Sequence, residues 1–262
     1  MDDTSLATLR ARYDRVLRRD AGPDEPGARV ERVGAVVRQT SGRGGWSGVV
    51  WSRFGSAAEA DAAIAAQLDH FGACGLPFEW KLHEHDQPAD LGARLTAAGF
   101  LAEESETVMV AEVAALDRKP VWPEGLTVRE ITDPAELAGV LDVHRRVFGG
   151  DQEPLRRRLT AQLTEAQDTV RLSLVCAGEL PVCAARLELD PGSGFAGLWG
   201  GGTLPEWRGR GVYRALVAHR AARAERAGAR WLHVDASAES RPILERLGFR
   251  PLAVTTPYLS PR

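Results

Sequence analysis

The segment Pro-Glu-Trp-Arg-Gly-Arg-Gly-Val-Tyr at residues 205–213 constrains the fold more than any other part of the chain. Small residues at 200–203 precede it, and residues 213–227 follow with apolar side chains at helical spacing. The implied order is strand, glycine bend, helix. Backbone N–H groups at a helix start have no intrahelical partners and share the positive end of the dipole. Because glycines let a ligand approach that backbone closely, the bend predicts a diphosphate-binding site.

Two common nucleotide-binding motifs do not fit this bend. A Walker loop requires Lys-Ser or Lys-Thr after its last glycine, whereas this bend continues with Val212 and Tyr213. A dinucleotide-binding fold requires Gly-x-Gly-x-x-Gly and an acidic residue about twenty positions further on. Asp235 is a candidate for that residue, but the glycine spacing differs. Another anionic cofactor is therefore favoured, with an ordinary structural turn as the alternative.

Two motifs in the C-terminal half resemble those of the GCN5-related N-acetyltransferase (GNAT) superfamily. The run from Arg208 fits the family's Arg/Gln-x-x-Gly-x-Gly/Ala signature, with Tyr213 in place of the last small residue. The segment Leu-Glu-Arg-Leu-Gly-Phe at 244–249 is similar to the family's Tyr-Glu-x-Leu-Gly-Phe ending. The resemblance covers about residues 125–262. It implies a mixed α/β acyl-CoA N-acyltransferase fold with acetyl-CoA as the acyl donor.

The resemblance also implies which residues hold acetyl-CoA. In the family the pantetheine arm adds to the strand ahead of the bend as a pseudo-strand, and an asparagine that often contacts the cofactor corresponds here to Ser237. Glycines are poor strand formers, so the run at 200–202 indicates close packing by a ligand, a β-bulge, or both. The implied cofactor-binding residues are Gly201, Gly202, Thr203, Arg208, Gly209, Arg210, Gly211, Val212, Tyr213, Arg214 and Ser237.

The candidate catalytic residues only partly follow the family pattern. Acetyl transfer to an amine needs a base, donors for the tetrahedral oxyanion and an acid for the leaving thiolate. The family's tyrosine acid falls at Leu244, which cannot donate a proton. His233, where some members carry Glu, and Asp235 are the candidate bases, with Glu188 as a third and Tyr258 as a candidate acid. The alternative is that His233 is a buried structural histidine and that Asp235 caps the next helix.

The two halves of the chain repeat one plan. Asp86 precedes Phe100 by 14 residues, and Asp235 precedes Phe249 by the same 14 residues. Leu95 and Gly99 correspond to Leu244 and Gly248. Such a fixed offset predicts an internal duplication. At that offset the cofactor bend falls on Glu-Ala-Asp-Ala at 59–62, where two carboxylates would repel phosphates.

We therefore expect two tandem GNAT-type domains of the α/β class. Residues 1–116 form a degenerate domain, 117–125 a linker, and 126–262 the catalytic domain. In the first domain, residues 30–37 and 48–51 are expected as hairpin strands around a glycine-rich turn at 42–45, and residues 57–71 as a helix. That turn precedes a strand, so a hairpin is favoured over a second phosphate cradle. In the second domain, strands at 126–130, 172–177, 182–189 and 195–203 and a helix at 153–165 are expected.

Composition excludes several classes of function. A net charge of −3 argues against a nonspecific nucleic-acid binder. Three scattered cysteines indicate neither a disulfide framework nor a zinc site, and His83 with His85 lacks further ligands, so no metal is expected. The chain has neither the apolar core of a signal peptide nor a run of roughly 18 apolar residues. A cytoplasmic protein without a membrane partner is expected.

The expected function is transfer of acetyl from acetyl-CoA to a primary amine by direct attack through a tetrahedral intermediate. A non-catalytic acyl-CoA-binding sensor or partner protein is the alternative, consistent with Leu244 at the tyrosine position. O-acetylation and longer acyl chains stay open. The acceptor, a small-molecule or peptide amine, cannot be read from the sequence. Exposed strand edges at a domain boundary would pair with the other half or, in a homodimer, with a second chain.

Overall fold

The computed structural model describes residues 5–42 and 45–261. They form two compact units that exchange segments of the chain. Unit 1 comprises Met1–Val108, Asp235–Arg241 and Pro251–Arg262, and unit 2 comprises Met109–Val234 and Pro242–Arg250. Residues 43 and 44, in the expected glycine-rich turn, lie outside the described residues. No helix in the described part of the chain is long and apolar enough to cross a membrane.

Unit 1 is a sheet with the strand order β1-β2-β3-β4-β12, and β5 pairs with β12. Its strands are β1 (Arg29–Val33), β2 (Val36–Thr40), β3 (Gly48–Ser52), β4 (Glu79–His83), β5 (Leu101–Ala102) and β12 (Arg250–Leu259). Its helices are α1 (Leu6–Tyr13), which continues into a π-helix (Asp14–Arg19), α2 (Ala57–Cys74) and α3 (Leu91–Ala97). The expected strand at 30–37 is wrong, because a turn at Gly34 with φ of +60° divides it into β1 and β2.

The core of unit 1 lies under α2 and is built from aromatic rings. Phe71 stacks on Phe78 with ring centroids 4.2 Å apart, and Phe100 meets Phe78 edge-on at 5.3 Å. Trp80 and Ile64 are buried in the same cluster.

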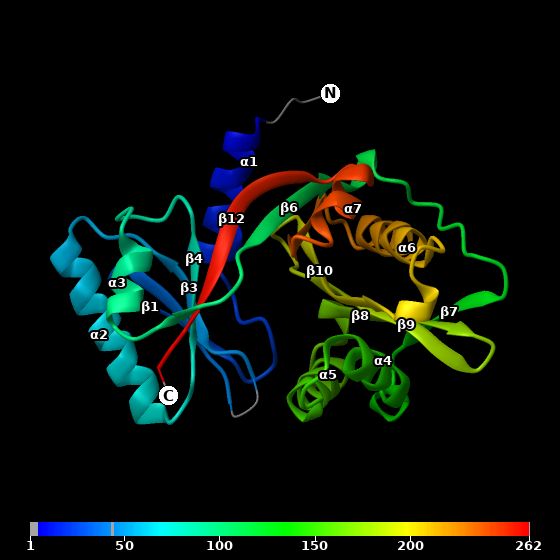
Figure 1. Cartoon of the computed structure of the whole chain (residues 1–262), viewed down its shortest axis with the longest axis horizontal. Coiled ribbons are helices and arrows are strands. Elements are labelled where there is room, and N and C mark those ends of the chain that lie inside the picture. Colours follow the sequence, from blue (N-terminus) through cyan, green and yellow to red (C-terminus); the bar gives the residue numbers. More distant parts are fainter. Residues whose placement is uncertain (1–4, 43–44, 262) are drawn as a thin grey trace. The chain divides into compact units, whose positions relative to one another are not determined.

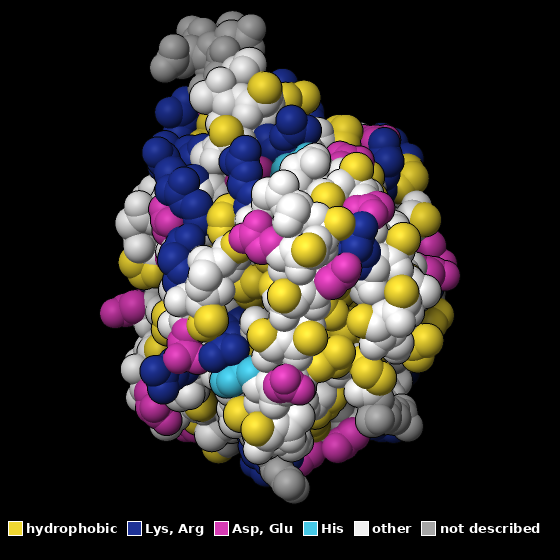
Figure 2. All heavy atoms as spheres, turned by 90° about the vertical axis from the view of Figure 1, so that its left-hand side faces the viewer, with side chains coloured by type: hydrophobic (Ala, Val, Ile, Leu, Met, Phe, Trp, Pro, Cys, Tyr) yellow, Lys and Arg dark blue, Asp and Glu magenta, His cyan; other side chains and the backbone are white. Residues whose placement is uncertain are grey.

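On the face of the molecule in Figure 2, acidic and basic side chains are intermixed. Neither sign of charge covers the whole face.

The last strand of the chain completes the sheet of unit 1. β12 follows α7 of unit 2, yet it pairs antiparallel with β4 from Thr255↔His83 to Leu259↔Glu79. The Thr255 hydroxyl also donates to the Leu82 carbonyl at 3.1 Å. Residues more than 170 positions apart in the sequence therefore share one sheet.

Unit 2 is a mixed sheet with the strand order β11-β10-β9-β8-β7. Its strands are β7 (Leu126–Ile131), β8 (Val170–Ala177), β9 (Leu180–Leu189), β10 (Phe195–Thr203) and β11 (Trp231–Ala236). The last two residues of β11 belong to unit 1. Strand β6 (Glu106–Glu112) begins in unit 1 and enters unit 2 at Met109. Its helices are α4 (Ala138–Phe148), α5 (Glu153–Glu165), α6 (Val212–Arg226) and α7 (Arg241–Arg246). In Figure 1, α6 and α7 cover one face of this sheet, and α4 and α5 cover the other. The expected α/β class is confirmed.

Unit 1 also contains a network of buried charges. Arg18 pairs with Asp86 at 2.6 Å and with Asp14 at 2.8 Å, and His85 Nε2 contacts Asp14 at 2.8 Å. His83 lies beside this network, with its ring 5.7 Å from that of His85 and 6.2 Å from that of Tyr13. Burial, together with the positive charges of Arg18 and Lys81, holds the His83 pKa well below its ordinary value.

This shift makes unit 1 sensitive to acid. Below about pH 6.5 the unfolded chain protonates His83 while the folded protein keeps it neutral, so stability falls as the pH drops. We expect His83→Gln to flatten the dependence of the unfolding free energy on pH between 6.5 and 5. The change in slope is up to about 1.4 kcal/mol per pH unit. Urea unfolding at several pH values measures it, and equal slopes for the two proteins would contradict the assignment.

Candidate functional site

The glycine bend leaves the start of α6 open. Gly211, with φ of +84°, is the N-cap residue, and no side chain accepts a hydrogen bond from the first turn of the helix. A Cβ at Gly209 or Gly211 would meet no atom within 4 Å. Arg208 Nε donates to the Thr203 carbonyl at 3.1 Å, which ties the bend to the end of β10. The start of α6 is therefore uncapped, and the space beside Gly209 and Gly211 is open, as an anion site requires.

The corresponding helix of unit 1 is closed to an anion. Residues 59–62 lie inside α2, which begins at Ala57 with Ser56 as its N-cap. Ser56 Oγ accepts from the Glu59 N–H at 3.2 Å, and the Glu59 carboxylate accepts from the Gly55 N–H at 2.8 Å. The chain's own carboxylate thus sits at the start of α2, where a phosphate would have to bind.

Strand β10 changes its pairing in the middle. Its parallel register with β11 covers three residue pairs and, within the described residues, ends at Gly197↔His233. Its register with β9 shifts between Trp199 and Gly202, which is a β-bulge. Gly200 has φ of +56°, a conformation that favours glycine. Beyond Gly197, backbone groups on the β11 side of β10 are therefore left to pair with something other than β11.

Side chains pack closely around the glycines of this bulge. On the α4 side, the Cβ position of Gly200 lies 3.3 Å from Arg186 Nη1, and that of Gly202 lies 3.0 Å from the Phe148 ring. On the α6 side, the Cβ position of Gly201 lies 3.3 Å from the Tyr213 ring and 3.5 Å from Arg220 Nη2. Larger residues would displace these neighbours, which explains the glycine run.

Two of the candidate bases share one row of the sheet. Glu188 of β9 and His233 of β11 are both in register with Gly197, so the three residues face the same side of the sheet. A Cβ at Gly197 would overlap the Trp199 indole nitrogen and lie 3.2 Å from His233 Nε2. The His233 ring is edge-on to Phe195 at 6.2 Å and to Trp199 at 6.0 Å. Gly197 therefore makes room for the indole and the imidazole to lie together.

Glu188 is engaged by two arginines. Arg158 Nη2 of α5 and Arg186 Nε of β9 each lie 3.2 Å from Glu188 Oε1. On α4, His144 Nδ1 lies 2.8 Å from Gln152 Oε1, and its ring contacts that of Phe148 at 4.6 Å. Burial, and secondarily the Arg186 cation, lowers the His144 pKa. Nothing in the local sequence marks Arg158 as a neighbour of Glu188, because the fold brings the two residues together.

Three further predicted site residues, Asp235, Ser237 and Tyr258, lie in unit 1. The glycine bend, Glu188 and His233 lie in unit 2. The Asp235 side chain is 3% exposed and forms an ion pair with Lys81 Nζ. Burial lowers the Lys81 pKa, but Asp235, Tyr13 and Glu79 together outweigh that effect and raise the pKa above its ordinary value. Tyr258 of β12 is opposite Trp80, and its hydroxyl lies 2.5 Å from the Cβ position of Gly92. Ser237 Oγ accepts from the Ser240 N–H at 3.3 Å.

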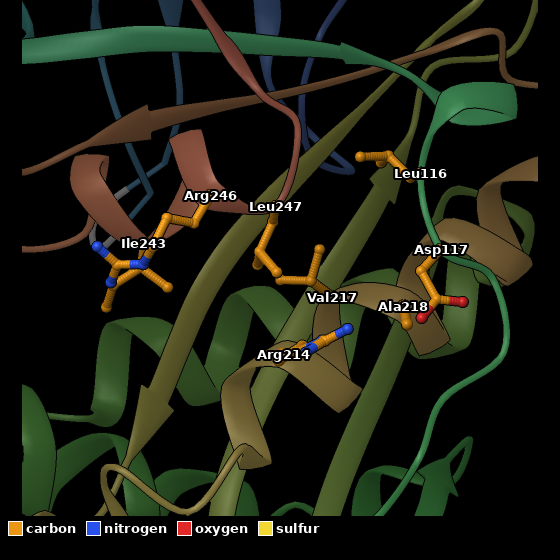
Figure 3. Close-up of a pocket in the computed structure, with 8 residues that line it drawn as sticks. All are labelled: Leu116, Asp117, Arg214, Val217, Ala218, Ile243, Arg246 and Leu247. Carbon is orange, nitrogen blue, oxygen red and sulfur yellow. The ribbon is translucent and has the colours of Figure 1, made fainter.

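A cavity of about 440 Å³ opens in unit 2 between α6 and α7 (Figure 3). Its lining is apolar except for three charged residues, and Leu247, the residue after α7, points toward Val217 of α6. Arg214, in the first turn of α6, connects the cavity with the glycine bend. The lining residues are Leu116, Asp117, Arg214, Val217, Ala218, Ile243, Arg246 and Leu247. Within the described ranges, no cluster of three His, Cys, Asp or Glu side chains is arranged to hold a metal ion.

Comparisons with known proteins agree with this architecture. A model of the acetyltransferase (GNAT) family matches residues 138–249. A search of curated protein sequences finds no match. Among solved structures, a GCN5-related N-acetyltransferase from Kribbella flavida is 20% identical, with a TM-score of 0.70 over 90% of each chain. A second such enzyme, from Sphaerobacter thermophilus, is 16% identical, with a TM-score of 0.59 over 86% of this chain and 76% of that chain.

The tandem organisation also has a solved counterpart. A tandem GNAT protein from the clavulanic acid biosynthesis pathway is 13% identical, with a TM-score of 0.62 over 99% of this chain and 95% of that chain. At such identities the likeness establishes the fold alone. Residues 138–249 of this chain match the GNAT family model, and the whole chain has the fold of a tandem GNAT protein.

Proposed function

We propose that this protein is an N-acetyltransferase that transfers acetyl from acetyl-CoA to a primary amine, and that unit 2 supplies the glycine bend that binds the cofactor. The observation that carries the proposal is the open, uncapped start of α6 at Gly209 and Gly211. The match of residues 138–249 to the GNAT family model supports acyl-CoA as the anion bound there.

The diphosphate of the cofactor would accept hydrogen bonds from the N–H groups of Gly209, Gly211 and Val212, with Arg208, Arg210 and Arg214 supplying positive charge. The pantetheine arm carries two amides. They would pair with the edge of β10 at Gly201, Gly202 and Thr203, beyond the point where β11 leaves that strand. Tyr213 would lie behind this edge, against Gly201.

The adenosine 3′-phosphate would lie at the cavity between α6 and α7, where Arg214 and Arg246 supply two guanidinium groups. We expect Arg246→Gln to weaken CoA binding about 3–10-fold, the range for a partly solvated charge-assisted hydrogen bond. Binding of dephospho-CoA should not change. Calorimetric titration measures both ligands, and Arg250→Gln, an exposed arginine outside the cavity, is the control. An equal loss for both ligands would contradict the placement.

For the chemistry, we propose that His233 removes a proton from the acceptor ammonium. An imidazole ordinarily titrates near neutrality, and His233 lies in the same row as Gly197 at the point where β10 and β11 separate. Asp235 is less suited to this role, because Lys81 already engages its carboxylate. Glu188 would act through Arg158 and Arg186, which it orients. The amine then attacks the thioester carbonyl, and the C–S bond breaks with its electron pair on sulfur.

We also propose that residues 1–116 derive from a second GNAT-type domain that no longer binds the cofactor, that 117–125 are a linker and that 126–262 carry the catalysis. The closed start of α2 supports the proposal that only the second domain binds the cofactor, because the Glu59 carboxylate lies where a phosphate would have to bind.

The proposed activity is tested by incubating the protein with acetyl-CoA and a panel of primary amines, with release of CoA thiol and the mass of the product as readouts. At least one amine should be acetylated, and His233→Gln should slow turnover by about 100-fold or more, as expected for loss of a general base. The turnover of Glu188→Gln, which changes the other candidate base in the same row of the sheet, is measured for comparison. Cofactor binding without turnover of any amine would favour an acyl-CoA-binding sensor, a reading that the buried Leu244 also favours.

A further inference from the structure

One buried cation of unit 2 has no matching anion. Arg220 lies in the third turn of α6 and is 1% exposed. Its Nη1 donates to the Arg186 carbonyl at 3.3 Å, and its Nε donates to the Leu216 carbonyl at 3.4 Å. The Tyr213 ring and the guanidinium both approach the Cβ position of Gly201. These contacts fix the side chain without neutralising its charge.

No carboxylate among the described residues forms an ion pair with Arg220. Burial lowers its pKa, and the groups that act in the opposite direction are Tyr213 on α6 and Cys183 on β9. Both are weak acids. Burial also raises the pKa of Cys183, so this thiol stays neutral near pH 7. Arg220 Nη2 has no hydrogen-bond partner within residues 5–42 and 45–261. A buried charge without a counter-ion is costly unless something pairs with it.

The guanidinium lies behind the bulge of β10. Its Nη2 and Nη1 atoms are 3.5 and 3.7 Å from the Cβ position of Gly201, and the Tyr213 ring is 3.3 Å from the same point. Because Gly201 has no side chain, the guanidinium can approach the backbone of β10 closely at this residue. A larger residue at this position would push the guanidinium away.

We propose that Arg220, together with Tyr213, stabilises the CoA thiolate that leaves during transfer. This inference rests on the proposed function, which puts the pantetheine arm at Gly201–Thr203. The amine nitrogen forms a bond to the thioester carbon, the C–S bond breaks with its electrons on sulfur, and the nitrogen loses its proton to the base. Arg220 remains protonated throughout.

A group that stabilises the leaving thiolate is needed here, because α7 does not carry the family's tyrosine acid. A leaving thiolate must be either protonated or stabilised by positive charge. The position of the family's tyrosine acid is Leu244, which is buried and apolar. A cation that never releases its proton lowers the pKa of the leaving thiol by charge alone, and a neighbouring opposite charge shifts a pKa by about 1–3 units.

The test is the pKa of the thiol of CoA bound to the full-length protein, followed by thiolate absorbance, with desulfo-CoA as the blank. For the wild type we expect a value about 1–3 units below the ordinary thiol value of about 8.5. An unshifted thiol in bound CoA would overturn this inference and leave the proposed function intact. Failure of CoA to bind would overturn the proposed function and this inference with it.

Variants separate charge from structure. Arg220→Met should raise the pKa of the bound thiol to that of free CoA, with acetyl-CoA affinity changed less than about threefold. Arg220→Lys should keep the thiol pKa lowered, because it retains the charge. Arg223→Met, which removes an arginine one turn along α6 that pairs with Glu130, is the matched control. A thiol pKa that is equally low in Arg220→Met and wild type would refute the role of Arg220.

Discussion

Replacing Gly211 by Asp is expected to weaken acetyl-CoA binding by at least about 100-fold while the protein stays folded. The new carboxylate would accept hydrogen bonds from the N–H groups at the start of α6, as the hydroxyl of the N-cap residue Ser56 does at the start of α2. It would also repel the diphosphate. Aspartate is a favourable N-cap residue and tolerates the φ of +84° at this position better than most residues do. Calorimetric titration measures the change.

Two matched variants separate the causes of this loss. Gly211→Asn fills the same space without a charge and should give an intermediate affinity. Gly228→Asp introduces the same side chain at a glycine with φ of +78° beyond the other end of α6, where no atom lies within 4 Å of the Cβ position. That variant should bind acetyl-CoA as the wild type does. If Gly211→Asp also bound normally, the bend would not be the diphosphate site.

Deletion of residues 251–262 is expected to unfold unit 1. The deletion removes all but the first residue of β12, so β4 loses its antiparallel partner and β5 loses its only strand partner among the described residues. Trp80, which is opposite Tyr258, would lose its cover on that side. The aromatic core under α2 would then be exposed to water. We expect rapid proteolysis within residues 5–42 and 45–108.

The control for this deletion is removal of residues 261 and 262 alone, which leaves β12 and the hydrogen bond from the Ser260 N–H to the Phe78 carbonyl in place. It should resist protease as the wild type does. If the shortened protein, residues 1–250, resisted protease, the stability of unit 1 would not depend on β12.

Local patterns predicted much of this fold. The bounds expected for the strand at 195–203 and the helix at 153–165 are those of β10 and α5. The glycine bend was expected as well, because glycine spacing and helical periodicity are both encoded within a few residues. The bulge at Gly200 was one of two expected reasons for the glycine run, and it is present.

Pairings between distant parts of the chain were beyond such patterns. Lys81 and Asp235 are 154 residues apart, and no local sequence pattern predicts that one neutralises the charge of the other. Tyr258 was expected in a tail that reaches back toward the cofactor, but the structure has it in β12 opposite Trp80. Arg220 has the helical spacing of a core residue, and only the fold reveals that its charge has no counter-ion.

The most direct test of the account is amide hydrogen exchange of the full-length protein with and without acetyl-CoA. We predict slower exchange in two segments, residues 201–203 at the edge of β10 and residues 209–213 at the start of α6. Residues 55–61 at the start of α2 should not change. Protection at α2, or unchanged exchange at both segments of unit 2 in the presence of saturating acetyl-CoA, would contradict the proposal that this cofactor binds at the glycine bend.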